Sequence, residues 1–487
     1  METDASGPPS KKLRPAALDT GEVPNPSPSP SPAPAADTES AANEPRKTDG
    51  GDDGHGVDCV SRLPDAILQE IISLLPTNDA ARTQTLASRW CHLWRSAPLN
   101  LDHGHLPAAD EANAGNLVSR ILSLHRGPGR RFSIDALHLH LRRDTVDGWL
   151  RSTSLDNLQE LEFYSPEYTR PRALLLPPPA STFRFSSTLR AATISQCSLP
   201  DETARSLHFP QLRQLQLQQI GVSDESLRRI IAGCPVLEGL LLSSIDGFHC
   251  LRIISPTIKN IGMRFISGEL IIEDAPSLQS LLHLDLQTGL KLSVLSTPKL
   301  ETLGCLNDHG WSSKLEFGST VIKELRVVSL ITAKHSVKVL AVSSYNVNLD
   351  VIVDLMRCFP CLEKLYIQWN TSGGQNLWRH KHQNLIKCPD NRLKTVVLAN
   401  YNGAKSQINF VTFFVLNARM LESLRLMVDA YNYKEYFFIE QHWLLEMDNR
   451  VSRQAQIDFT CDRCRQGLIH VRHVKDMFTS DPFICHC

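Results

Sequence analysis

The sequence predicts an α/β protein in which a disordered N-terminal tail precedes three short helices and a solenoid of strand-bearing repeats. Residues 1–56 contain ten prolines and no aromatic residue, so they cannot bury enough apolar surface to offset the entropy of ordering. Residues 57–102 then carry apolar side chains at helical spacing. Farther along, a proline-leucine pattern recurs every 20 to 25 residues, as in solenoid proteins.

Charge, hydropathy and cysteine usage exclude several function classes. The 51 lysines and arginines nearly cancel the 52 aspartates and glutamates, which gives no electrostatic basis for binding nucleic acid or an anionic membrane. No apolar run approaches the roughly 18 residues that span a bilayer. The 13 cysteines are scattered and no signal peptide precedes them, so we expect free thiols in the nucleus and/or cytoplasm. A basic cluster at Lys11, Lys12 and Arg14 is either an import signal or an ordinary solvated cluster.

Three short helices are expected within about 40 residues after Val57. Pro64 suits a first helical turn, and Pro76 ends that helix. Asn78 or Asp79 caps a second helix, and Ser88 a third. A unit of this size is usually completed by a partner or a neighbouring domain.

The third helix contains SRWCHLWRS, in which a cysteine and a histidine lie between two tryptophans. Residues four apart share a helix face, so Trp90 and Trp94 form one stripe. Cys91 and His92 project in different directions, which disfavours both a nucleophile–base pair and a two-ligand metal site. The tryptophans are either core residues of the unit or hot spots of an interface, and the spacing leaves both open.

The run LPDAILQEIISLLPTNDAARTQTLASRWCHLWRSAPLNLD resembles the plant-type F-box. Its landmarks are Leu63-Pro64-Asp65, Leu75-Pro76-Thr77, Asp79-Ala80, Leu86, Ser88-Arg89-Trp90, Leu93-Trp94 and Pro98-Leu99. Cys91-His92 stands where family members often carry a basic residue. The resemblance implies binding to a Skp-type adaptor and, through it, a cullin. The adaptor-binding residues would be Leu63, Pro64, Ile67, Ile71, Leu75, Pro76, Leu86, Trp90 and Trp94.

The pattern P-x-L-x-x-L, with isoleucine allowed for leucine, begins at six prolines and indicates an irregular leucine-rich-repeat solenoid. These are Pro210, Pro235, Pro256, Pro276, Pro298 and Pro360. Each repeat would put a strand on the concave side, whereas 223–234 and 348–359 read as helices on the convex side. Cysteines 234, 358 and 361 fit as small apolar residues of the repeats.

Residues 391–428 resemble the FBD module that follows leucine-rich repeats in many plant F-box proteins. Asn409 stands where an acidic residue is common, and residues 448–459 resemble the end of that module. The matching positions are Leu393-Lys394, Val396-Val397, Tyr401, Gly403, Phe410, Leu416-Asn417-Ala418 and Leu421. The expected layout is therefore a tail (1–56), an F-box (57–102), a solenoid (130–390), an FBD-like module (391–460) and a C-terminal tail (461–487).

Sequence motifs for catalysis are absent: there is no G-x-S-x-G, no phosphate-binding glycine loop and no dinucleotide fingerprint. Cys461-x-x-Cys464 with His470 and His473 could suit zinc, but the spacing is short for a finger. We therefore expect no catalytic residue, no metal site, no cofactor and an unremarkable C-terminal tail.

The function expected is that of a non-enzymatic substrate-recognition subunit of a Skp-cullin-F-box ubiquitin ligase. The alternatives are a leucine-rich scaffold without a ligase role and, from the C-terminal cysteines alone, a thiol- or zinc-dependent enzyme. Because residues alternate across a strand, leucines facing the core leave Gln216, Tyr366 and Gln368 exposed on the strand-bearing face. These three are expected to bind an unknown target protein.

Overall fold

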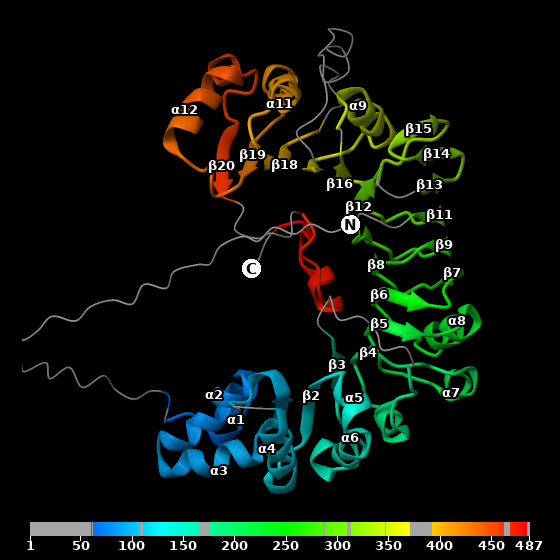
Figure 1. Cartoon of the computed structure of the whole chain (residues 1–487), viewed down its shortest axis with the longest axis vertical. Helices are drawn as coiled ribbons and strands as arrows, with labels where there is room; N and C mark the ends of the chain where they lie inside the picture. Colours follow the sequence, from blue (N-terminus) through cyan, green and yellow to red (C-terminus); the bar gives the residue numbers. More distant parts are fainter. Residues whose placement is uncertain are drawn as a thin grey trace, which may run out of the picture. The chain divides into compact units, whose positions relative to one another are not determined.

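A computed structural model describes residue 60 and residues 62–107, 111–165, 175–285, 289–308, 313–345, 347–370, 392–461 and 468–484. The predicted fold class is confirmed: an N-terminal helical region precedes a strand-rich repeat region of mixed α/β structure (Figure 1). The tail expected to be disordered, 1–56, lies outside the described residues.

The N-terminal helices pack around a small core of their own. They are α1 (Asp65–Leu74), α2 (Thr77–Arg82), the 3₁₀ turn η1 (Thr83–Thr85) and α3 (Ser88–Ser96). Pro64 and Pro76 immediately precede α1 and α2, where the missing N–H breaks no helical hydrogen bond. The buried residues are Leu68, Ile72, Ala80, Trp90, Leu93 and Ala97.

Beyond α3, the described residues form a 14-stranded sheet whose neighbouring strands all run parallel. Its strands, in spatial order, are β1 (Leu99–Asp102), β2 (Gly129–Asp135), β3 (Glu160–Tyr164), β4 (Ala191–Ser195), β5 (Gln214–Gly221), β6 (Gly239–Asp246), β8 (Asn260–Arg264), β10 (Ser280–His283), β12 (Thr302–Asn307), β16 (Val339–Ser344), β17 (Lys364–Trp369), β18 (Thr395–Tyr401), β19 (Ser423–Val428) and β20 (Gln456–Cys461). Each repeat proline lies four residues before its strand, where its missing N–H leaves the ladder intact. The FBD-like strands continue the same sheet.

One side of this sheet is covered by helices and by a second sheet. The helices are α4 (Glu111–Leu124), α5 (His138–Leu141), α6 (Arg143–Leu150), α7 (Asp201–Ser206), α8 (Asp224–Ala232), α9 (Leu349–Cys358), α11 (Lys405–Asn417) and α12 (Glu435–Leu444), with 3₁₀ turns η2 (His103–His105), η3 (Thr153–Leu155), η4 (Ala180–Phe185) and η6 (Met447–Asn449). The helices expected at 223–234 and 348–359 correspond to α8 and α9. Among the helices of the described ranges, none combines the length and hydropathy needed to cross a membrane.

The second sheet is a feature that the repeat pattern did not predict. Its strands are β7 (Cys250–Ile254), β9 (Gly268–Asp274), β11 (Leu290–Ser296), β13 (Lys314–Phe317), β14 (Thr320–Lys323) and β15 (Arg326–Ser329). The 25-residue repeat from Pro210 has room for α8, whereas the next three, of 21, 20 and 22 residues, each hold a strand instead. A shorter return path favours an extended segment because it needs fewer residues per ångström than a helix.

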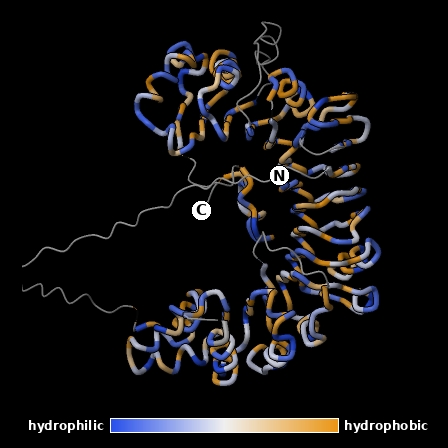
Figure 2. Tube along the Cα trace, in the orientation of Figure 1, coloured by the Kyte–Doolittle hydropathy of each residue, from blue (hydrophilic) through white to orange (hydrophobic). Residues whose placement is uncertain are grey.

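The two faces of the large sheet bury different side chains. Leu215, Leu217, Leu365 and Ile367 enter the main core beneath the helices and the second sheet. Hydrophobic positions recur along the whole strand stack, as this continuous core requires (Figure 2). The opposite face, here called the segment face, carries Gln216, Tyr366 and Gln368 and packs against residues 468–484, the C-terminal segment.

Candidate functional site

Helix α1 presents one apolar row to the core and another to solvent. Leu68 and Ile72 are buried, whereas Ile67, Ile71 and Leu74 are 49%, 39% and 70% exposed. The exposed residues follow i, i+4, i+7 spacing, so they form a continuous stripe on one helix face. A stripe of large apolar side chains that the unit's own core does not use is a candidate protein-binding surface.

The other expected adaptor-binding residues fall into three groups. Pro64, Pro76 and Leu86 are exposed, Leu86 to 65%. Leu63, Leu75 and Trp94 are partly buried against the three-helix core. Trp90 is a core residue with 6% exposure. Leu74, which was not among the expected site residues, belongs with the exposed group, and its spacing from Ile67 and Ile71 could have revealed it.

The two tryptophans of SRWCHLWRS therefore have different surroundings. Trp90 lies inside the three-helix core. Trp94 bridges that core to His125, whose ring it meets edge-on at 5.4 Å between centroids. Cys91 donates its thiol hydrogen to the Gln84 carbonyl oxygen at 3.2 Å, and His92 is exposed. As expected from the helix geometry, Cys91 and His92 face different surroundings.

Polar contacts connect the three-helix unit to the start of the large sheet. Thr77 Oγ1 donates to the carbonyl oxygen of Asn100 at 3.0 Å and accepts from the amide of Asp102 at 2.9 Å. Arg130 on β2 pairs with Glu70 on α1 at 2.7 Å. His125 contacts the Ala97 carbonyl oxygen at 2.8 Å, and burial lowers the pKa of its imidazole. Side chains of the three-helix unit and of the residues that follow it therefore hold the two regions together, in addition to the chain that links them.

The three residues expected to bind a target are not exposed, which corrects the sequence-based expectation. Gln216, Tyr366 and Gln368 are 3%, 4% and 8% exposed. They do point away from the leucine core, as strand alternation predicts. The C-terminal segment covers them, however, and alternation within a strand contains no information about a segment more than a hundred residues away in sequence. Their role in target binding stays a prediction.

The segment is held by hydrogen bonds to its main chain and by one buried carboxylate. Gln216 donates to the Arg472 carbonyl oxygen at 3.3 Å and accepts from the Val474 amide at 3.0 Å. Asp481 accepts from the Tyr366 hydroxyl at 2.7 Å and from Lys364 Nζ at 2.8 Å. Burial, reinforced by Asp481, raises the pKa of Tyr366, so its hydroxyl stays protonated and donates.

The apolar side of the segment has a period of three. Leu468, Val471, Val474 and Met477 are buried against the segment face, the last two within the 3₁₀ helix η7 (Val474–Phe478). Side chains at i and i+3 of a 3₁₀ helix lie in line. Figure 1 shows this part of the chain (red) beside β5, β6 and β8, against which η7 packs. The tail was expected to be unremarkable, and this spacing is the signal that could have identified it.

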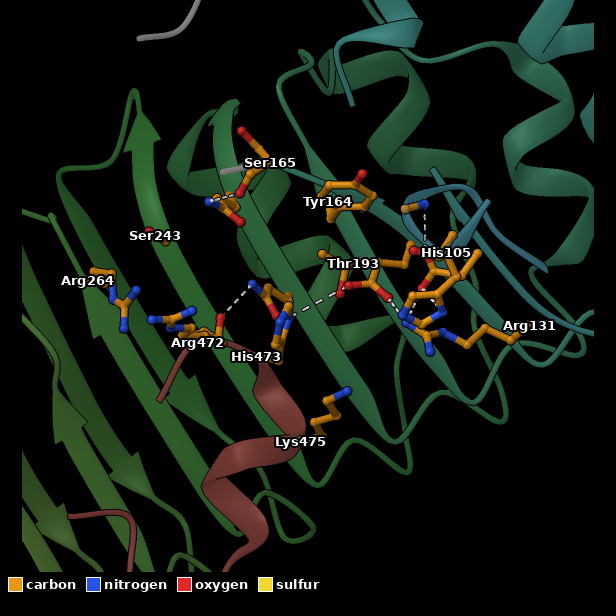
Figure 3. Close-up of a pocket in the computed structure, with 17 residues that line it drawn as sticks. His105, Arg131, Tyr164, Ser165, Thr193, Ser243, Arg264, Arg472, His473 and Lys475 are labelled. Atoms are coloured by element: carbon orange, nitrogen blue, oxygen red, sulfur yellow. Dashed lines mark hydrogen bonds and ion pairs between the residues drawn. The ribbon is translucent and has the colours of Figure 1, made fainter. Parts of the chain in front are cut away.

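A cavity of about 450 Å³, lined mainly by residues with polar side chains, lies between the segment and strands β1 to β6 and β8 of the large sheet (Figure 3). Its lining includes Arg131 and Glu162 from the strands and His473 and Lys475 from the segment. Arg131 pairs with Glu162 at 2.5 Å. Burial opposes the charge of Arg131, but Glu162, Asp102 and Glu160 outweigh that effect and raise its pKa. His473 Nδ1 lies 3.6 Å from a Glu162 carboxylate oxygen, so the segment contacts the Arg131–Glu162 pair of the sheet.

Four buried cysteines of the repeats are unsuited to thiolate chemistry. Burial raises the pKa of Cys197, Cys234 and Cys305 to about 12, and burial together with Asp354 raises that of Cys358 to about 11. Cys464 of the weighed zinc motif lies outside the described residues. Within the described ranges, no three histidine, cysteine or acidic side chains gather as metal ligands would.

Three family models match the chain. The F-box domain matches residues 60–102, the repeats of "FBD-associated F-box protein At5g56370, LRR repeats" match residues 146–367, and the FBD matches residues 381–426. Together they extend from α1 into β19. The matches place the exposed stripe of α1 in the F-box and the segment face on the repeats and the FBD.

Curated relatives carry the F-box, and in part the FBD and the leucine-rich repeats, in their names. The chain is 24% identical to the FBD-associated F-box protein At4g10400 of Arabidopsis thaliana over 421 residues, which is 83% of this chain and all of that one. It is 28% identical to the F-box/FBD/LRR-repeat protein At1g13570 of the same plant, over 46% of this chain and 53% of the relative. The F-box/LRR-repeat protein At5g02910, also from Arabidopsis thaliana, is 31% identical over 41% of this chain and 42% of its own length.

Proposed function

We propose that this chain, which belongs to the plant F-box/leucine-rich-repeat proteins with an FBD domain, is the substrate-recognition subunit of a Skp-cullin-F-box ubiquitin ligase. The F-box binds a Skp-type adaptor and through it a cullin, and the repeats hold a target protein, in the nucleus and/or cytoplasm. The chain itself performs no covalent step. It accelerates ubiquitin transfer by holding the target near the ubiquitin-conjugating enzyme.

The exposed stripe Ile67, Ile71 and Leu74 is the single observation that carries this proposal. The F-box already has a core, so these side chains are available to a partner. Fully burying an exposed large aliphatic side chain is worth about 1.5–3 kcal/mol. These three are partly covered already, so each can contribute a part of that value to a complex. Leu86 adds a fourth exposed apolar side chain in the same small unit.

The contacts between the F-box and the first strands support the same function. Thr77 and Glu70 bind the segments that begin the sheet. A receptor that presents a target at a defined distance from its adaptor needs such an attachment, because a long flexible linker would lower the effective concentration of target lysines.

The test is adaptor binding by an α1 variant. Ile71→Asp in the full chain should weaken binding to a purified Skp-type adaptor by at least about tenfold in calorimetry, because it leaves a charge in an apolar interface. Ile331→Asp is the matched control, since Ile331 is 74% exposed outside the F-box. Equal binding by both variants would remove the basis of the proposal.

The alternative, a leucine-rich scaffold without a ligase role, differs in one measurable respect. A ligase subunit recovers both the adaptor and a cullin when it is purified from plant cells, and Ile71→Asp loses both together. A scaffold recovers its partners with or without that substitution. Thiolate chemistry at Cys197, Cys234, Cys305 or Cys358 is disfavoured by their raised pKa values.

A further inference from the structure

The C-terminal segment occupies the segment face in the way that a bound peptide occupies a receptor. Most of the polar contacts go to its main chain: Gln216 binds Arg472 and Val474, and Gln368 accepts from the Leu468 amide at 3.2 Å. Side chains that bind main-chain groups fix the path of a peptide without demanding a particular sequence. Beyond the buried apolar side chains, a further contact that depends on the residue type lies at the segment's C-terminal end.

Two side chains of that end, a buried carboxylate and an aromatic ring, contact the sheet. The Asp481 carboxylate is 2% exposed and lies between Lys364 and Tyr366. Two residues later, Phe483 packs on the Tyr366 ring at 5.3 Å between centroids. Hydrogen bonds to a buried charge are worth about 1.5–3 kcal/mol, and an aromatic pair adds about 0.5–1.5 kcal/mol. An aspartate followed two positions later by an aromatic residue is therefore the feature that this end of the groove selects.

The segment face is shaped for an occupant. A Cβ on Gly262 would lie 2.7 Å from Met477 Sδ, so the glycine on β8 makes room for the segment. Without an occupant, Leu241, Leu282 and Val397 would face water together. Simple opening is therefore unfavourable, and a second ligand of similar chemistry must replace the segment as it leaves.

The polar side chains beneath the segment suit such an exchange. Gln216, Gln368 and Lys364 are paired when the segment is bound and can be hydrated when it is not. A cover that never opened would be better stabilised by an apolar surface, since buried polar groups gain little net free energy from their hydrogen bonds. The cavity beside Arg131 and Glu162 gives a longer ligand further space along the sheet.

We propose that the segment face is the docking groove for the target, and that residues 468–484 are an internal competitor for it. The target enters as a polypeptide segment with an aspartate two residues before an aromatic residue. The aspartate binds Lys364 and Tyr366, and the aromatic ring packs at a tilt against the Tyr366 ring. That the ligand of this groove is a target protein rests on the proposed function, whereas the groove and its competing segment are properties of this chain alone.

The test uses a synthetic peptide of residues 468–484, labelled at its N-terminus. A chain that ends at residue 461 should bind it in fluorescence anisotropy at least about tenfold more tightly than the full chain, whose groove is occupied. The same peptide with Asp481→Asn, and a scrambled peptide, should each bind at least about tenfold more weakly to the truncated chain. Tyr366→Phe in the truncated chain should weaken binding, and Tyr431→Phe, at an exposed tyrosine, should not.

A second variant keeps the proposal testable if the truncated chain aggregates. The full chain with Asp481→Asn and Phe483→Ala retains the segment but weakens its anchor, so it should bind the wild-type peptide more tightly than the unaltered chain does. Failure of either folded variant to bind the peptide, or equal affinity for the scrambled peptide, would show that the segment is a permanent part of the fold. Adaptor binding, measured separately on the same variants, reports on the F-box alone and distinguishes failure of the groove from failure of the proposed function.

Discussion

Trp90→Ala tests whether the tryptophan stripe of the F-box is a core or an interface. Trp90 is 6% exposed and belongs to a core of only six buried residues. Truncating a buried tryptophan to alanine costs about 3–5 kcal/mol, through lost burial and the cavity left behind. So small a core has few other side chains to close that cavity, so we expect the upper part of this range.

Hydrogen exchange localises the effect better than a thermal midpoint does, because a chain with several structural regions need not unfold in one step. A loss of 3–5 kcal/mol should speed the exchange of amides in α1 and α3 by about 10²–10⁴-fold. Amides of β17 and β18 should be unaffected. Trp443→Ala is the matched control, since Trp443 is 73% exposed on α12.

The adaptor provides the decisive comparison. Ile71→Ala removes an exposed side chain, so it should weaken adaptor binding while leaving the exchange rates of α1 and α3 near those of the wild type. Trp90→Ala should weaken binding only because the unit opens. A Trp90→Ala protein with normal protection and lost adaptor affinity would refute the assignment of Trp90 to the core.

Two further predictions concern the sheet. Burial lowers the pKa of His283 to about 4 despite nearby Asp285, so the folded chain binds fewer protons there than the unfolded chain. The free energy of unfolding should therefore be highest above about pH 6.5 and fall by roughly 3 kcal/mol as the pH drops toward 4. In urea unfolding, His283→Gln should flatten this pH dependence. Gly262→Ala should displace the C-terminal segment, because the new Cβ would lie 2.7 Å from both Leu241 and Met477. Trypsin cleavage after Lys475, followed by mass spectrometry, should then be about tenfold faster. Gly148→Ala is the control, because its Cβ would have open space around it and the cleavage rate should not change.

The linear pattern of residues determined the local structure and the domain order. Pro64 beside the helix start and apolar residues at helical spacing were sufficient for α1, since these signals act within one or two turns. The leucines of RQLQLQQ predicted which side of β5 faces the main core, because alternation is a property of a single strand. The F-box landmarks identified the adaptor-binding candidates as a group.

Tertiary packing decided which members of each pattern are available to a partner. Ile71 and Ile72 are equally apolar neighbours, and only the positions of α2 and α3 expose the first and bury the second. Gln216 and Tyr366 point away from the leucine core as predicted, yet a segment 258 and 115 residues away in sequence covers them. Burial depends on the whole chain around a residue, whereas a sequence pattern describes only its near neighbours. For that reason the sequence determined the faces of this protein, and only the fold decided which of them meets solvent.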